Sequence, residues 1–80
     1  MWKVFKLTNV ALSECYAGVT DGDPHLKLRE AADGEIEEID YWDGEEHRIE
    51  LAVIKEFPGE LEAVECLGDI VSKDHCHRAV

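Results

Sequence analysis

Histidine and cysteine gather near the C-terminal end of the chain, where Asp74-His75-Cys76-His77 offers side-chain types that bind zinc in proteins. Adjacent residues seldom all reach one ion, and a fourth ligand such as Cys66 or His47 would have to come from elsewhere in the fold. We therefore expect a disordered polar tail that holds no metal. Zinc binding by this tail is the alternative.

The three cysteines, Cys15, Cys66 and Cys76, are an odd number and include no C-x-x-C pair. Such a set is a poor disulfide framework and is typical of a reducing compartment. Cys15 lies in a strand-like run and Cys66 on an apolar helical stripe, so we expect both to fill the core. Cys76 is expected to be an exposed thiol, and the protein to be cytoplasmic.

Eight acidic residues, and neither lysine nor arginine, lie between Asp33 and Glu46. The run could suggest an EF-hand calcium loop, with Gly22, Gly34 or Gly44 as its glycine. In each of these three alignments, the first ligand position holds a residue whose side chain cannot bind calcium. The run therefore predicts a solvated acidic surface, on which a basic protein partner could bind. The candidate contact residues are a tryptophan expected to be partly exposed and the acids around it: Asp40, Trp42, Asp43, Glu45 and Glu46.

The composition allows one small domain, because the chain has 80 residues and 45% of them are hydrophobic. Its formal charge of −11 repels phosphate backbones, which disfavours DNA binding. We expect no membrane-spanning segment, and the first residues lack the apolar core of a signal peptide.

Hydrophobic periodicity and turn residues indicate the elements that must position these groups. Alternating runs predict three strands, and helical spacing predicts three helices, the first between a turn at Asp23-Pro24 and Gly34. In chain order these are strands at 2–8 and 14–20, helices at 24–33 and 35–42, a strand at 48–57 and a helix at 61–71. We expect an α+β fold of order ββααβα, with a three-stranded antiparallel sheet flanked by helices, over residues 1–73, followed by the tail at 74–80.

The first two strands carry a family resemblance. The runs Val4–Asn9 and Cys15–Thr20 resemble the paired-strand signature of the GIY-YIG endonuclease superfamily, and the expected element order is similar. The resemblance covers about residues 2–72 and implies that fold, together with a DNA-cleaving site that uses Mg²⁺ or Mn²⁺.

The family's functional positions match this sequence only in part. The second motif's tyrosine and glycine correspond to Tyr16 and Gly18, whereas Phe5 stands where the first motif has a tyrosine and lacks a hydroxyl to move a proton. The helical arginine corresponds to Arg29 or, in better register, to Lys27.

Two further positions of the family pattern carry no polar group. A family histidine falls at Ala31, and the metal-binding glutamate falls at Leu67, with Glu65 and Asp69 expected on the solvent side of that helix. The resemblance thus implies a degenerate GIY-YIG-like domain that works by binding, with the groove near Tyr16 and the acidic run as contact regions. The alternative is a metal-dependent nuclease with relocated groups, in which Tyr16, Lys27 and Arg29 are catalytic and Glu65 or Asp69 holds the metal.

Overall fold

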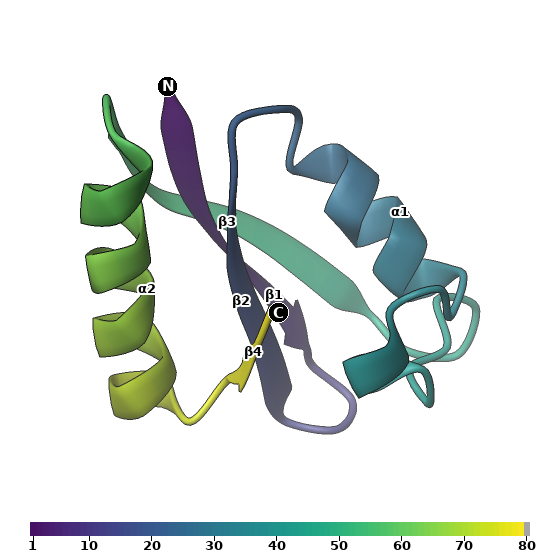
Figure 1. Cartoon of the computed structure of the whole chain (residues 1–80). Coiled ribbons are helices and arrows are strands. Elements are labelled where there is room, and N and C mark those ends of the chain that lie inside the picture. The colour runs from purple at the N-terminus through teal and green to yellow at the C-terminus, as the bar shows by residue number, and fades with distance from the viewer. Residues whose placement is uncertain (80) are drawn as a thin grey trace.

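The computed structural model describes residues 1–79 and has an α+β fold built on one four-stranded sheet (Figure 1). Strands β1 (Trp2–Asn9) and β2 (Glu14–Thr20) form an antiparallel hairpin, and β3 (Ile49–Phe57) pairs antiparallel with the other side of β1. A short β4 (His77–Arg78) runs parallel to β2, which gives the order β3-β1-β2-β4. The two α-helices are α1 (His25–Ala32) and α2 (Glu60–Asp74).

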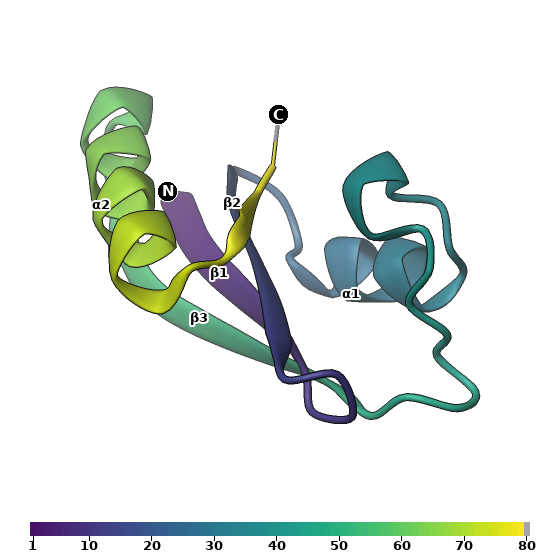
Figure 2. The same ribbon diagram turned by 90° about the horizontal axis from the view of Figure 1, so that it is seen from below.

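The central strand β1 carries apolar residues on both faces of the sheet, and both faces are buried. On one face, Phe5 and Leu7 pack with Ala31 of α1; we call this cluster the α1-face core. On the other face, Val4 packs with Leu67 of α2 in the α2-face core. Figure 2 shows the sheet lying between the two helices.

The start and end of α1 follow the turn chemistry of the sequence. The Asp23 carboxylate accepts a hydrogen bond from the His25 backbone N–H at 2.9 Å, and Pro24 precedes the helix with φ −65°. This bond and a second one from the His25 ring lower the pKa of Asp23. After the helix, Gly34 adopts φ +74°, and its N–H donates to the Ala31 carbonyl, as expected of a glycine that ends a helix.

The helix predicted over 35–42 is wrong, because this segment forms only a 3₁₀ turn, η1 (Glu37–Ile39). Its three buried apolar residues are spaced by three: Ile36, Ile39 and Trp42. That spacing matches the 3.0-residue period of a 3₁₀ helix. Backbone bonds from Ile39 N–H to the Ile36 carbonyl and from Trp42 N–H to the Ile39 carbonyl complete the arrangement.

The prediction of a three-stranded sheet followed by a disordered tail is also wrong. Helix α2 continues to Asp74, and His75 then takes the left-handed conformation at φ 56°. This turn directs the chain back along β2, where residues 77–78 form β4. The observed order is therefore ββαβαβ, with a mixed sheet.

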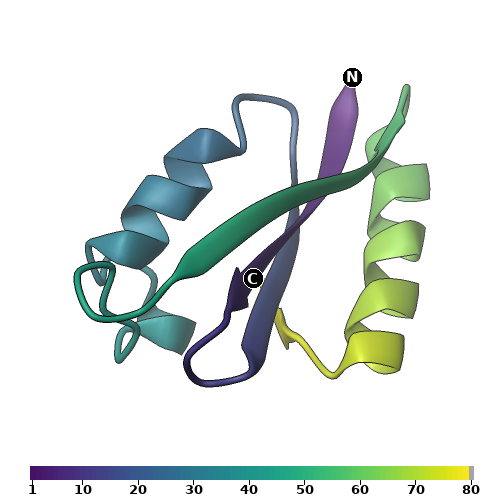
Figure 3. The same cartoon turned by 180° about the vertical axis from the view of Figure 1, so that it is seen from behind.

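Strand β3 is an edge of the sheet and is largely exposed along its length. Seen from behind, it crosses between α1 and α2 (Figure 3). A register shift opposite Val4 and Phe5 interrupts its pairing with β1, and both Val53 and Ile54 are exposed there. Within residues 1–79, no helix is long and apolar enough to cross a membrane.

Candidate functional site

The residues from Asp33 to Glu46, which we call the acidic segment, lie beside α1 and cover part of the α1-face core. Ile36, Ile39 and Trp42 are buried and fix the segment to the sheet. All eight of its acidic side chains are exposed. Alternation of buried apolar anchors with exposed acids thus produces a surface of carboxylates on a fixed backbone.

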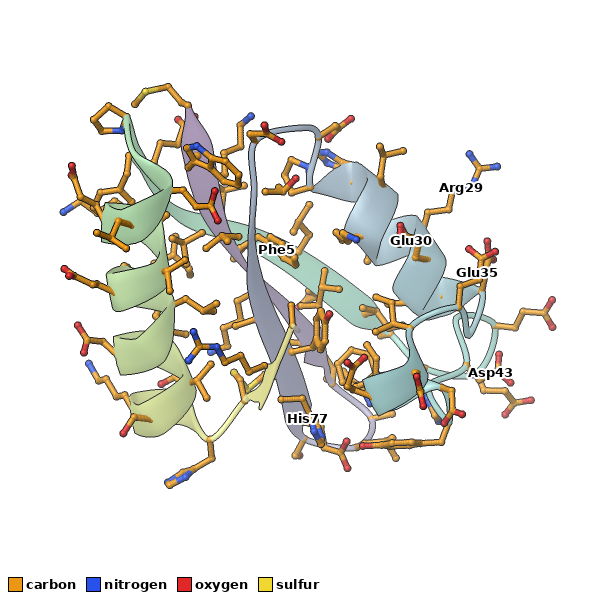
Figure 4. All side chains as sticks on the ribbon, in the orientation of Figure 1. Phe5, Arg29, Glu30, Glu35, Asp43 and His77 are labelled. Atoms are coloured by element: carbon orange, nitrogen blue, oxygen red, sulfur yellow. A yellow bond between two sulfur atoms is a disulfide. The ribbon has the colours of Figure 1, made fainter. Side chains whose placement is uncertain are left out.

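The charge of this surface is not balanced by neighbouring basic groups. Within residues 1–79, no ion pair involves a carboxylate of the acidic segment. Figure 4 shows Glu35 and Asp43 on the outer side of the molecule, with Glu30 of α1 nearby. Arg29 is exposed and extends outward from α1 on the same side. A cationic partner could therefore approach these carboxylates without displacing a partner from within the fold.

A buried polar contact fixes the C-terminal end of the acidic segment. The Asn9 side chain is fully buried; its Nδ2–H group donates to His47 Nδ1 at 3.1 Å, and its Oδ1 accepts from the Leu12 N–H. His47 Nδ1 also accepts from the Asp43 N–H at 3.0 Å. No local sequence signal links His47 to Asn9, which lies 38 positions away.

Close packing against α1 fixes the same region. The Gly44 N–H donates to the Ala32 carbonyl at 3.1 Å, and a Cβ added to Gly44 would lie 2.5 Å from the Ala32 Cβ. Only glycine allows the backbone to approach the helix this closely. The segment is therefore anchored at its apolar residues, at Gly44 and by His47, the residue that follows it.

The expectation of a partly exposed Trp42 is wrong, and its neighbour Tyr41 is the exposed aromatic residue. Trp42 is only 2% exposed, and its Nε1–H group donates to the Glu14 carboxylate at 3.3 Å. Tyr41 is 50% exposed and donates its hydroxyl proton to the same carboxylate. Tyr41, not Trp42, is therefore the aromatic residue that a partner could contact on this surface.

The Glu14 carboxylate joins three elements. Besides Tyr41 and Trp42, the Glu14 carboxylate contacts His77 of β4. The His77 Nε2 lies 3.4 Å from Glu14 Oε1 and 3.2 Å from the Tyr41 hydroxyl. Hydrogen bonds from Tyr41 and Trp42 lower the pKa of Glu14, and the bond to Glu14 raises the pKa of Tyr41. Sequence reasoning missed this cluster, because its members lie far apart along the chain.

Tyr16 is buried and is a weak candidate for a base. It is 4% exposed in the α1-face core, with its ring centroid 6.5 Å from that of Phe5. Burial, followed by the charges of Glu38 and Glu30, raises the pKa of Tyr16 to about 12. Its phenolate is therefore scarcely populated at neutral pH.

The structure does not bring the carboxylate candidates of the nuclease alternative to the sheet face that holds Tyr16. Glu65 and Asp69 are exposed on α2, which covers the opposite face of the sheet. Leu67 is buried in the α2-face core and so does not lie opposite Tyr16 either. On α1, Lys27 is half-buried, and its Nζ donates to Glu30 at 3.5 Å.

The cysteine predictions require a correction, because Cys15 and Cys76 form a disulfide across 61 positions of the sequence. Cys76, expected to be an exposed thiol, is 7% exposed in the α2-face core, where Cys15 is also buried as predicted. Cys66 is free and packs against the same cluster. Cysteine usage therefore gives no support for a reducing compartment, and a cytoplasmic location stays a prediction.

Within residues 1–79, no group of three or more histidine, cysteine or acidic side chains has the geometry to hold a metal ion. Comparison with known proteins finds no match among protein-family models, curated proteins or solved structures.

Proposed function

We propose that this chain is a binding module and that its acidic segment takes a basic protein partner. The observation that carries the proposal is the fixed backbone of the segment, which presents eight exposed carboxylates without an ion-pair partner among residues 1–79. A surface with anchored charges loses little conformational freedom when a partner binds. The exposed ring of Tyr41 adds a rigid aromatic contact within this surface.

We further propose that the domain is a degenerate member of the GIY-YIG endonuclease superfamily. Phe5 and Tyr16 occupy the two motif positions on β1 and β2, and their rings are neighbours in the α1-face core. These positions serve packing in this chain, since Tyr16 is buried and Phe5 has no hydroxyl. The placement of Glu65 and Asp69 on the far face gives no support to the alternative of an Mg²⁺- or Mn²⁺-dependent nuclease.

Charge removal at two matched surfaces tests the binding proposal. The test variant Glu37→Gln/Glu38→Gln/Asp40→Asn neutralises three exposed acids of the acidic segment. The control variant Glu62→Gln/Glu65→Gln/Asp69→Asn removes the same charge from exposed positions of α2. Binding of a fluorescein-labelled decalysine peptide is followed by anisotropy at about 0.15 M salt, where exposed charges interact over roughly 8 Å.

The test variant is expected to bind the peptide about tenfold more weakly, because three exposed ion pairs contribute roughly 0.5 kcal/mol each. The control variant should stay within about twofold of the parent protein if the acidic segment is the binding surface. Equal weakening by both variants would mean that net charge alone attracts the peptide, and the proposal would fail.

A further inference from the structure

The C-terminal residues 75–79, which we call the strap, lie along the outer edge of β2. Only a short stretch of backbone pairing attaches them to β2. In the pairing of β2 with β4, Tyr16 lies opposite His77 and Ala17 lies opposite Arg78. The Ala79 N–H donates a hydrogen bond to the Ala17 carbonyl at 2.8 Å. Chain ends held by so few bonds are ordered only where another interaction ties them down.

Three side-chain contacts supply that interaction. The Cys15–Cys76 disulfide joins the strap covalently to β2. The adjacent His77 ring meets Glu14 and Tyr41 at 3.4 and 3.2 Å, and both contacts are partly exposed to solvent. Exposed polar contacts of this kind each contribute little free energy, so the disulfide is the dominant restraint that holds the strap on β2.

The strap covers one position of the sheet that has no side chain of its own. A Cβ added to Gly18 would lie 2.8 Å from the Ala79 Cβ and 2.9 Å from the Phe5 ring, so Ala79 sits directly against the glycine. Ala79 also packs against the α1-face core. The remaining members of that core come from β1, β2, α1, β3 and the acidic segment, so it does not depend on the strap for its assembly.

We propose that the strap is a redox-controlled cover: reduction of the Cys15–Cys76 disulfide by a dithiol releases residues 75–79 from β2 and leaves the rest of the domain folded. A thiolate of the reductant attacks one sulfur, the S–S bond breaks, and a mixed disulfide forms. The second reductant thiol then displaces the remaining cysteine. Two electrons and two protons pass to Cys15 and Cys76, which end as thiols, and the reductant ends as a cyclic disulfide.

Release has three local consequences. Cys76 leaves the α2-face core, whose remaining members come from β1, β2, β3 and α2. The Ala17 carbonyl and the neighbouring edge of β2 lose their partner strand, and Gly18 becomes accessible beside Phe5. Tyr41 loses its contact with His77 but keeps its hydrogen bond to Glu14. The proposal concerns the β2 edge and is independent of whether the acidic segment binds a basic partner.

Backbone ¹⁵N relaxation of the full chain, recorded before and after addition of dithiothreitol, tests the proposal. Order parameters of residues 76–79 should fall from about 0.85 to below about 0.6, while those of β1, β2 and β3 stay near 0.85 with native amide shifts. Cys76→Ser should show the mobile strap without reductant, and Cys66→Ser should behave like the parent protein in both states.

Two outcomes would overturn the proposal. An ordered strap in the reduced protein would mean that β4 pairing and the His77 contacts suffice to hold it. Loss of native shifts throughout β1–β3 on reduction would mean that the disulfide maintains the whole fold and controls no local cover.

Discussion

Removal of the Cys15–Cys76 disulfide is expected to lower the global stability of the domain strongly. The bond closes a loop across 61 sequence positions. In the chain-entropy account, a loop of this length restricts the unfolded chain by about 4 kcal/mol at 25 °C. An 80-residue domain has a total free energy of unfolding of roughly 4–12 kcal/mol, so reduction should remove a large share of it.

Urea unfolding followed by far-ultraviolet circular dichroism measures this effect on oxidised and reduced protein. With a slope of about 1–1.5 kcal/mol per M for a chain this small, the midpoint should fall by about 3 M on reduction. Cys66→Ser is the control, because it leaves the disulfide in place, and the difference between its two redox states should match that of the parent. Midpoints that differ by less than about 0.5 M would refute the reasoning, since a loop closed in the native protein must restrict its unfolded chain.

Two further predictions concern Tyr16 and the glycines. Tyr16 should ionise near pH 12 in spectrophotometric titration. Because its pKa is raised on folding, its contribution to stability is complete below about pH 10 and is lost as pH rises through about 12. An ordinary pKa near 10 would contradict its burial. Gly44→Ala should lower the free energy of unfolding by about 1–3 kcal/mol, because the new Cβ meets the Ala32 backbone at 2.9 Å. Gly68→Ala on α2, where nothing lies within 4 Å of the added Cβ, should instead raise the free energy of unfolding by about 0.5–1 kcal/mol. Thermal melts compare the stabilities of the two variants, and equal effects would count against the close packing at Gly44.

Much of the fold could be predicted from the sequence, because hydrophobic alternation and turn residues act locally. Apolar residues on both faces of β1 indicate a strand that is buried on both sides, and the structure covers those faces with α1 and α2. The boundaries of β2 agree with the prediction, and Gly34 follows α1 as expected. These signals depend on neighbours within a few residues, which a single sequence displays directly.

The tail and the candidate site could be predicted less well, because long-range contacts determine them. Cys15 and Cys76 meet only because His75 reverses the chain after α2, and neither spacing nor count signals that turn. Acids on both sides of Trp42 suggest an exposed ring, yet its three-residue spacing from Ile39 carries it into the core. Tyr41 is left at the surface as a result.

Chemical-shift mapping of ¹⁵N-labelled protein with the decalysine peptide tests the central claim most directly. The binding proposal predicts that the largest amide shifts fall within residues 33–46, Tyr41 included, with small changes on α2. Shifts that are as large on α2 as on the acidic segment would contradict the proposal. A parallel titration with branched DNA and Mg²⁺ should leave Tyr16, Lys27 and Arg29 unshifted, and specific shifts at these three residues would instead favour the nuclease alternative.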